Sequence, residues 1–538
     1  MSGRRIETVL AHRWARIGLA LTAGAAAALA HTPFGVLPGM LGYPLLMLLA
    51  ERSTRVRGAV WMGWLAGFAY FGIGCWWVAE AFLVNPAQAW MAPFAASLLP
   101  MGLGLFWGAA AGLYRRYAPS GVARVLVFAA AFGLLEWLRG HVLTGFPWNP
   151  AGAGWKAGSA ASQFAAVAGV YGLGVVTVAA VSAFGPLAVA GERRGRIVAA
   201  GLGAAVLAAL VIGGAVRLGQ ARLGFTDTTV RIVQADIDQN YKWSPDAYRS
   251  IVERYLDLTA LPAARTPDIV VWPEGALPTT AAQVFADGAP EAAALAQVLR
   301  PGQSLIMGLS RDQADATAEG GARYFNSLFV LTDEGEAGLR IAAVYDKYRL
   351  VPFGEYLPLG SLMSRLGVRS LVHVPADFSP GPRPAPIRVP GVGPVQPLIC
   401  YEGLYPGFTP AGRGRPEWIV NISNDAWFGA TSGPIQHLNL ASYRAIETGL
   451  PIVRSTPTGI SALIDPWGRV VGDHSLGSGQ SGVIDGRLPR PTSATLYGRF
   501  GDGLFWLLIL SGFSALAPWS RAIPWLKSRL DSSRDRQA

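Results

Sequence analysis

Three segments of this 538-residue chain each place one reactive side chain directly after an apolar, strand-like run. The three residues are, in chain order, Glu274, Lys347 and Cys400, and the last of them ends the run that begins at Val395. A nucleophile at the tip of a strand is held on a rigid element and presented outward to a substrate. A carboxylate, an ammonium and a thiol are together the groups that acyl transfer requires.

The three side chains have complementary chemical roles. A cysteine thiol is mostly protonated at neutral pH and needs a base, for which Glu274 is available. Attack on a carbonyl produces an oxyanion, which a fixed cation such as Lys347 stabilises by roughly 2.7 to 4 kcal/mol in a dry site. Taken singly, Cys400 is better explained as a small buried hydrophobe, and the two charges as ordinary surface groups. Their joint occurrence after strands favours the catalytic interpretation.

The composition is that of a protein largely embedded in a membrane. Hydrophobic residues make up 51% of the chain and charged residues only 15%, and the mean hydropathy is +0.32. The net charge of +11 does not indicate a nucleic-acid partner, because the basic residues lie between hydrophobic spans rather than on one face. Cys75 lies inside a span, so no disulfide with Cys400 is expected. The 6 histidines show no ligand spacing, so neither a metal nor another cofactor is expected.

Eight apolar stretches of about 16 to 25 residues predict eight transmembrane helices. They lie near residues 15–31, 35–50, 58–80, 90–114, 122–139, 162–187, 196–216 and 502–520. Arginines gather in every second loop, which places those loops and the N-terminus in the cytoplasm by the positive-inside rule. Seven crossings then deliver the following segment to the outer face. The first stretch also resembles a signal peptide, although its place in a regular series of small-residue helices favours retention.

The pattern changes between about residues 220 and 495, where short β-rich runs alternate with helical stretches. The expected strands lie at 230–233, 268–272, 304–309, 327–331, 341–345, 396–400, 418–422, 452–455 and 460–464. Three regions follow from this pattern. They are an N-terminal membrane domain at 1–219 with about seven helices, an α/β catalytic domain outside the cytoplasm at 220–495, and a C-terminal helix with a basic cytoplasmic tail at 496–538.

The order of the motifs resembles the nitrilase, or carbon-nitrogen hydrolase, superfamily with its Glu-Lys-Cys triad. The matching segments are Val271-Trp-Pro-Glu274, Asp346-Lys347 with Gly354-Glu355, and Leu398-Ile-Cys400-Tyr401-Glu402. Joined to a polytopic N-terminus, they resemble the apolipoprotein N-acyltransferase family, which performs the last step of bacterial lipoprotein maturation. The resemblance covers nearly the whole chain and implies an α-β-β-α sandwich for the catalytic domain.

The resemblance also implies roles that spacing alone does not give. It implies that the triad is catalytic and that four further residues bind substrate or support the triad: Trp243, Glu355, Tyr401 and Glu402. The alternative for the two carboxylates is a solvent-exposed or fold-stabilising role. The apolar stretch at 362–372 is expected to form either a lipid-contacting lid or a buried satellite cluster.

The same resemblance implies the partners and the compartment. The acyl donor is expected to be a phospholipid, and the acceptor a diacylated apolipoprotein with a free α-amino group. The catalytic domain is expected to face the periplasm from the bacterial inner membrane, and the chain to act as a monomer.

Two other classes of protein stay open at this point. A membrane-anchored amide or nitrile hydrolase would use the same triad with water as the second nucleophile, although eight spans exceed what an anchor requires. A transporter or scaffold would use broken hydrophobic segments as substrate paths, although an intact triad argues against it.

Overall fold

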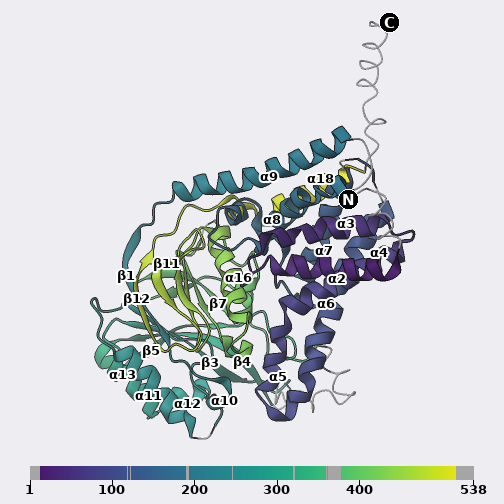
Figure 1. Cartoon of the computed structure of the whole chain (residues 1–538). Coiled ribbons are helices and arrows are strands. Elements are labelled where there is room, and N and C mark those ends of the chain that lie inside the picture. Colours follow the sequence, from purple (N-terminus) through teal and green to yellow (C-terminus); the bar gives the residue numbers. More distant parts are fainter. Residues whose placement is uncertain are drawn as a thin grey trace, which may run out of the picture.

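The computed structural model describes residues 12–516, except 118, 122, 189–192, 245, 319–320, 359, 361–376 and 413. A bundle of helices lies beside a two-sheet α/β unit, and the last described helix returns to the bundle (Figure 1). The predicted lid or cluster at 362–372 and the basic tail from residue 517 lie outside the described residues.

Apolar helices occupy all eight of the predicted hydrophobic stretches. They are α2 (Arg13–Leu29), α3 (Gly42–Glu51), α4 (Val56–Gly74), α6 (Ala92–Tyr117), α7 (Ala123–Arg139), α8 (Ala165–Ser182), α9 (Arg193–Gly219) and α18 (Gly503–Ser514). Within the described residues, 3 helical stretches are long and apolar enough to cross a membrane: Pro86–Tyr117, Ala161–Ala188 and Arg193–Gly219. A fourth is present if α4 and Trp76–Leu83, which meet at a bend of 64°, form one broken span. The number of eight crossings stays a prediction.

Small residues let the helices of this bundle approach closely. A Cβ on Gly67 of α4 would lie 2.7 Å from the Cα of Gly104 on α6, so the two backbones are nearly in contact. Lipid tails are as apolar as leucine, and close packing of this kind is therefore a main source of attraction between membrane helices.

The α/β unit contains two six-stranded sheets, in the orders β12-β1-β2-β3-β4-β5 and β11-β10-β9-β8-β7-β6. The first sheet consists of β1 (Phe225–Gln234), β2 (Ile269–Val271), β3 (Ser304–Ala314), β4 (Ala322–Asp333), β5 (Leu339–Asp346) and β12 (Gly482–Pro489). The second consists of β6 (Ile387–Val389), β7 (Gly393–Ile399), β8 (Trp418–Ile422), β9 (Ile452–Ser455), β10 (Ser461–Ile464) and β11 (Val470–Leu476).

All nine predicted strands are confirmed, and β6, β11 and β12 are additional. These three lack a strong strand signal, because β6 is short and the other two carry glycine and charged residues among their apolar positions.

The arrangement of layers is helix, sheet, sheet, helix. The centre of each sheet is parallel, β1-β2-β3 in one and β7-β8-β9 in the other, and parallel strands are normally buried on both faces. Val271 and Ile399 belong to the apolar layer between the sheets. Three helices cover the outer face of the first sheet: α11 (Ala247–Ala260), α12 (Ala281–Val284) and α13 (Pro290–Val298) (Figure 1).

One helix, α16 (Gly433–Thr448), lies between the second sheet and the helical bundle (Figure 1). Ala445 contacts the sheet, whereas Tyr443 and Ile446 belong to the apolar cluster of the bundle. The Tyr443 hydroxyl also donates to the carbonyl of Gly152 in the bundle at 2.9 Å. The second sheet is therefore fixed against the membrane helices through a helix that is buried on both sides.

Candidate active site

The structure brings Glu274, Lys347 and Cys400 together at the ends of β2, β5 and β7. Lys347 directly follows β5, Cys400 directly follows β7, and Glu274 lies on the loop after β2. The Lys347 Nζ donates to the Glu274 Oε1 at 3.0 Å. Both charges act on the Cys400 thiol, so the three groups form one electrostatic unit.

The backbone of Cys400 has a left-handed conformation, with φ of 49°. A residue with a side chain adopts this region only where the surrounding structure enforces it, and such positions are frequent at active sites. Cys400 opens the short 3-10 turn Cys400–Leu404 directly after β7. Cys400 is only 9% exposed, so the residue is largely buried.

Glu402 fixes this turn to the loop that carries the lysine. Its Oε1 accepts from the Tyr345 hydroxyl at 2.7 Å and from the Tyr348 amide at 2.8 Å, and its Oε2 accepts from the Ile399 amide at 2.7 Å. Burial raises the pKa of Glu402 to about 7, although these donors oppose the shift. Because both oxygens are occupied, Glu402 anchors the turn that carries Cys400, the candidate nucleophile, which is here called the nucleophile turn.

Glu355 and Asn326 fix the Glu274 carboxylate and the Lys347 ammonium. Lys347 Nζ donates to Glu355 Oε1 at 3.0 Å, and Asn326 Nδ2 donates to Glu274 Oε1 at 2.6 Å and to Glu355 Oε1 at 2.7 Å. Burial disfavours the charged form of Lys347, but the two carboxylates outweigh it and hold its pKa well above the usual value. The lysine is therefore an ammonium at neutral pH, with a fixed direction.

The thiol, in contrast, is protonated in the resting protein. Burial, followed by the negative charge of Glu274, raises the pKa of Cys400 to about 12, and Lys347 only partly opposes this. A nucleophilic thiolate can therefore form only as its proton is transferred to a base.

A glycine on β3 makes room for the loop that carries Glu274. A Cβ on Gly308 would lie 2.6 Å from the Cα of Glu274 and 2.8 Å from the amide nitrogen of Gly275. The loop is also tied to β3 by hydrogen bonds on both sides of Glu274, from Gly308 to Pro273 and from Ala276 to Gly308. The carboxylate is thus placed by close contact between backbones.

A buried polar network around Asp425 reaches the backbone carbonyl of Cys400. Asp425 pairs with His437 at 2.9 Å and with Arg454 at 2.7 Å, and it accepts from the Ser423 hydroxyl at 2.7 Å. His437 Nε2 lies 3.3 Å from the Cys400 carbonyl oxygen. Burial and then Arg454 lower the pKa of His437. This network fixes the main chain that carries the thiol.

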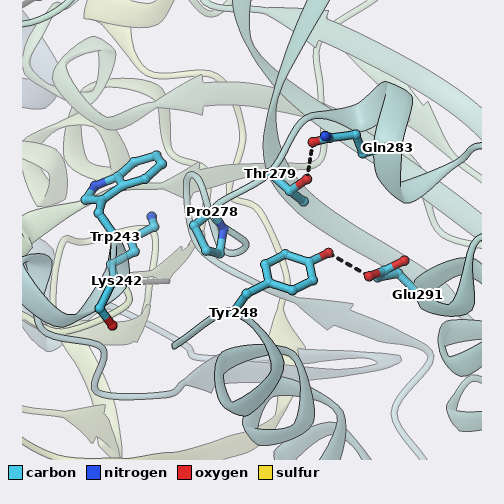
Figure 2. Close-up of a pocket in the computed structure, with 8 residues that line it drawn as sticks. Lys242, Trp243, Tyr248, Pro278, Thr279, Gln283 and Glu291 are labelled. Atoms are coloured by element: carbon cyan, nitrogen blue, oxygen red, sulfur yellow. Dashed lines mark hydrogen bonds between the residues drawn. The ribbon is translucent and has the colours of Figure 1, made fainter. Parts of the chain in front are cut away.

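The two predicted aromatic residues occupy different places. The Tyr401 hydroxyl donates to the carbonyl of Gly145 at 2.9 Å, so this side chain joins the nucleophile turn to the membrane bundle. Trp243 follows the short helix α10 (Gln239–Lys242), is 64% exposed, and lines a cavity of about 500 Å³ together with Lys242 (Figure 2).

Sequence reasoning missed some residues of the site. It gave no role to Asn326 or Lys242, and only the fold shows that Asn326 contacts both carboxylates and that the Lys242 ammonium bonds to the carbonyl of Gly275. His437 had no signal, because one histidine on a helix is most simply a core residue. Across the described parts of the chain, no three histidine, cysteine or acidic side chains gather as metal ligands.

Two family models together match most of the chain. Residues 229–496 match the model of the carbon-nitrogen hydrolase family, and residues 23–183 match that of the apolipoprotein N-acyltransferase N-terminal domain. An amidase of the nitrilase superfamily from Nesterenkonia AN1, with a solved structure, is 18% identical at a TM-score of 0.36, covering 53% of this chain and 98% of that chain.

Two curated relatives match almost from end to end. An apolipoprotein N-acyltransferase of Caulobacter vibrioides is 52% identical over 503 residues, which are 92% of this chain and 93% of the relative. An apolipoprotein N-acyltransferase of Rhodopseudomonas palustris is 36% identical over 511 residues, again 92% of this chain and 93% of the relative. The chain belongs to the apolipoprotein N-acyltransferase family.

Proposed function

We propose that Glu274, Lys347 and Cys400 are the catalytic residues of a two-step acyl transfer in this chain. The overall reaction follows from the family. The enzyme is an inner-membrane acyltransferase of lipoprotein maturation, which moves a fatty acyl chain from a phospholipid to the α-amino group of a diacylglyceryl-cysteine at a lipoprotein N-terminus.

In the first step the thiol attacks an ester of the phospholipid. The Cys400 proton moves to Glu274, a carbon–sulfur bond forms, and the carbonyl oxygen becomes an anion that the Lys347 ammonium stabilises. Collapse of this intermediate breaks the ester carbon–oxygen bond, and the proton on Glu274 passes to the departing alkoxide. The products are a thioester on Cys400 and a lysophospholipid.

In the second step the α-amine of the lipoprotein attacks the thioester. A carbon–nitrogen bond forms through a second oxyanion at Lys347, and the carbon–sulfur bond breaks. The proton that the amine loses passes through Glu274 to the thiolate, which restores the resting thiol. One donor product leaves before the acceptor reacts, so we expect ping-pong kinetics.

The observation that carries this proposal is the position of Glu274 Oε1 relative to Lys347 and Cys400. It lies 3.0 Å from a permanently charged Lys347 and acts on a strained Cys400 whose thiol requires a base. Glu355 then serves to hold Lys347, and Glu402 to hold the turn, through the hydrogen bonds described above. Tyr401 positions the turn against the bundle, and the exposed Trp243 is placed to contact substrate.

The membrane arrangement belongs to the same proposal. Eight crossings with basic loops inside would put the catalytic unit at 220–495 in the periplasm, with membrane regions at 1–219 and from 496 onward. The site then opens toward lipids of the outer leaflet, and a single chain contains all three catalytic groups, so a monomer suffices.

Mass spectrometry of the intact, purified protein tests the assignment. Incubation with phospholipid should add one acyl mass to Cys400, and adding a diacylated lipopeptide with a free α-amine should remove it as N-acylated lipopeptide. Cys400→Ala should insert normally and show no adduct. Rapid release of free fatty acid without acceptor, unchanged by the lipopeptide, would instead establish the membrane hydrolase.

A further inference from the structure

The cavity beside Trp243 contains a buried cation that the proposed chemistry does not use. Lys242 is only 4% exposed, and its ammonium donates to the carbonyl of Gly275, the residue that follows the base. Among the described residues no carboxylate forms an ion pair with this ammonium, and the charge of Glu274 only partly opposes the effect of burial on its pKa. An ammonium offers three donors, so hydrogen-bonding capacity is left over.

The surroundings of Lys242 are suited to a polar ligand. Figure 2 shows Lys242 and Trp243 on one side of the cavity, Pro278 between, and Tyr248 with Glu291 on the other side. The Lys242 Nζ lies 5.8 Å from the Trp243 ring centre. Tyr248 donates to Glu291 at 2.7 Å, which leaves a carboxylate across the cavity from the ammonium. The volume of about 500 Å³ is within the range of small-molecule sites.

Burial makes an unpaired ammonium unfavourable and lowers the pKa of Lys242 to about 8. An anion bound in the cavity would reverse this penalty, because a phosphate oxygen makes a charge-assisted hydrogen bond with lysine. Of the two substrates, the neutral diacylglyceryl part and the amine of the acceptor offer no such anion beside the reacting atoms. The phosphodiester of the donor lies only a glycerol unit away from its ester carbonyl.

We infer that the cavity binds the headgroup of the donor phospholipid, with Lys242 as the residue that contacts its phosphodiester. This inference rests on the proposed function, because it assumes that the ester of the same lipid reaches Cys400. Lys242 bonds to the carbonyl of Gly275, the residue that follows Glu274, so one short loop connects the headgroup contact to the base. When the lysophospholipid leaves, it takes with it the phosphodiester that Lys242 had bound, so the acceptor meets a site without a bound phosphate.

The test compares two donors on the same full-length protein in detergent micelles. One is a phospholipid and the other is a diacylglycerol with the same acyl chains, and the readout is the acyl adduct on Cys400. Lys242→Met should raise KM for the phospholipid by about tenfold or more, the loss expected for one charge-assisted hydrogen bond. The diacylglycerol reaction should slow much less, because that donor has no phosphodiester to lose. Lys242→Arg should retain most of the phospholipid affinity.

Two controls separate the anchor from other effects. Lys156→Met removes the same charge from an exposed position outside the cavity and should change neither donor reaction. A soluble glycerophosphodiester should compete with phospholipid in the wild-type protein and lose this effect in Lys242→Met. Inorganic phosphate at the same concentration should compete much less.

Several outcomes would overturn the inference without touching the proposed function. Equal slowing of both donors by Lys242→Met would mean that Lys242 only positions Gly275 and the base. An effect confined to discharge by the lipopeptide would assign the cavity to the acceptor peptide, and equal competition by inorganic phosphate would make it a general anion site. Absence of an adduct on wild-type Cys400 would overturn the proposed function itself.

Discussion

At the scale of single residues, the site holds a charged ammonium at Lys347 and a neutral thiol at Cys400, although both side chains are buried. Burial disfavours charge on both Lys347 and Cys400, but only Lys347 has two carboxylates within hydrogen-bonding distance. The lysine therefore keeps its charge for the oxyanion, and the thiol keeps its proton until substrate arrives. A resting enzyme of this kind is protected from unwanted reaction at Cys400.

The raised pKa of the thiol predicts slow alkylation. Burial and the charge of Glu274 raise the pKa of Cys400 to about 12, so the thiolate fraction is still increasing at pH 9 and 10. The rate of Cys400 modification by iodoacetamide should therefore keep rising with pH over this range. An ordinary thiol would reach a plateau shortly above its pKa of about 8.5. Mass spectrometry of the modified peptide measures the rate, with free cysteine as the reference. A plateau near pH 8.5 would show that the thiol is not held neutral.

Lys347→Met removes the ammonium that is proposed to stabilise both oxyanions, and it nearly keeps the volume of the side chain. We expect thioester formation to fall by about 10²- to 10³-fold, the loss typical of one oxyanion donor. The adduct on Cys400 after a fixed time with phospholipid is the measurement. Lys156→Met is the matched control, since it removes an exposed lysine far from the triad in sequence. An unchanged rate in Lys347→Met would exclude the lysine from the oxyanion site.

At the scale of elements, the catalytic groups lie where strands end, and β3 shapes the loop that follows β2. The hydrogen bonds on both sides of Glu274 fix this loop on β3, and the missing side chain at Gly308 makes room for it. A displacement of about 1 Å in a catalytic group can cost 10²-fold in rate. The glycine is therefore as relevant to activity as the residues that react.

Gly308→Ala tests this placement of the base. The new Cβ would meet the Glu274 backbone at 2.6 Å, so the loop must shift, and we expect a loss of activity on the order of 10²-fold with the fold retained. Thioester formation and thermal unfolding should be measured together. Gly412→Ala is the control, since nothing lies within 4 Å of its Cβ. Full activity in Gly308→Ala would mean that the loop tolerates the shift.

The local features of the site could be predicted from the sequence, whereas contacts between distant segments could not. The apolar runs before Glu274, Lys347 and Cys400 predict strands, and the structure confirms these strands. The outward presentation expected at the strand ends is not seen, because all three side chains are buried. The contact of Asn326 with Glu274 depends on the pairing of β2 with β3 and of β3 with β4, which one sequence does not specify. The hydrogen bond from Tyr401 to Gly145 joins residues more than 200 positions apart and has no local signal.

At the scale of the whole molecule, the nucleophile turn and α16 connect the second sheet to the membrane bundle. The Gln436 side chain accepts from the indoles of Trp77 at 3.1 Å and Trp148 at 2.8 Å. Tyr405 donates to Gly145 at 3.0 Å beside the bond from Tyr401. Buried polar contacts of this kind fix orientation as well as distance. The turn that carries Cys400 is thus held at the junction of the two parts.

The orientation of this assembly in the membrane gives the final prediction. Arginines lie in alternate loops, so residues near Arg55 should face the cytoplasm and the catalytic unit, including Asp246, should face the periplasm. Both positions are exposed and suited to labelling. In a background without the two native cysteines, a membrane-impermeant maleimide applied to intact spheroplasts should modify Asp246→Cys and spare Arg55→Cys. Permeabilised cells are the control, since both positions should then react. The reverse pattern would place the thiol on the cytoplasmic side, where it could not meet lipoproteins exported across the inner membrane.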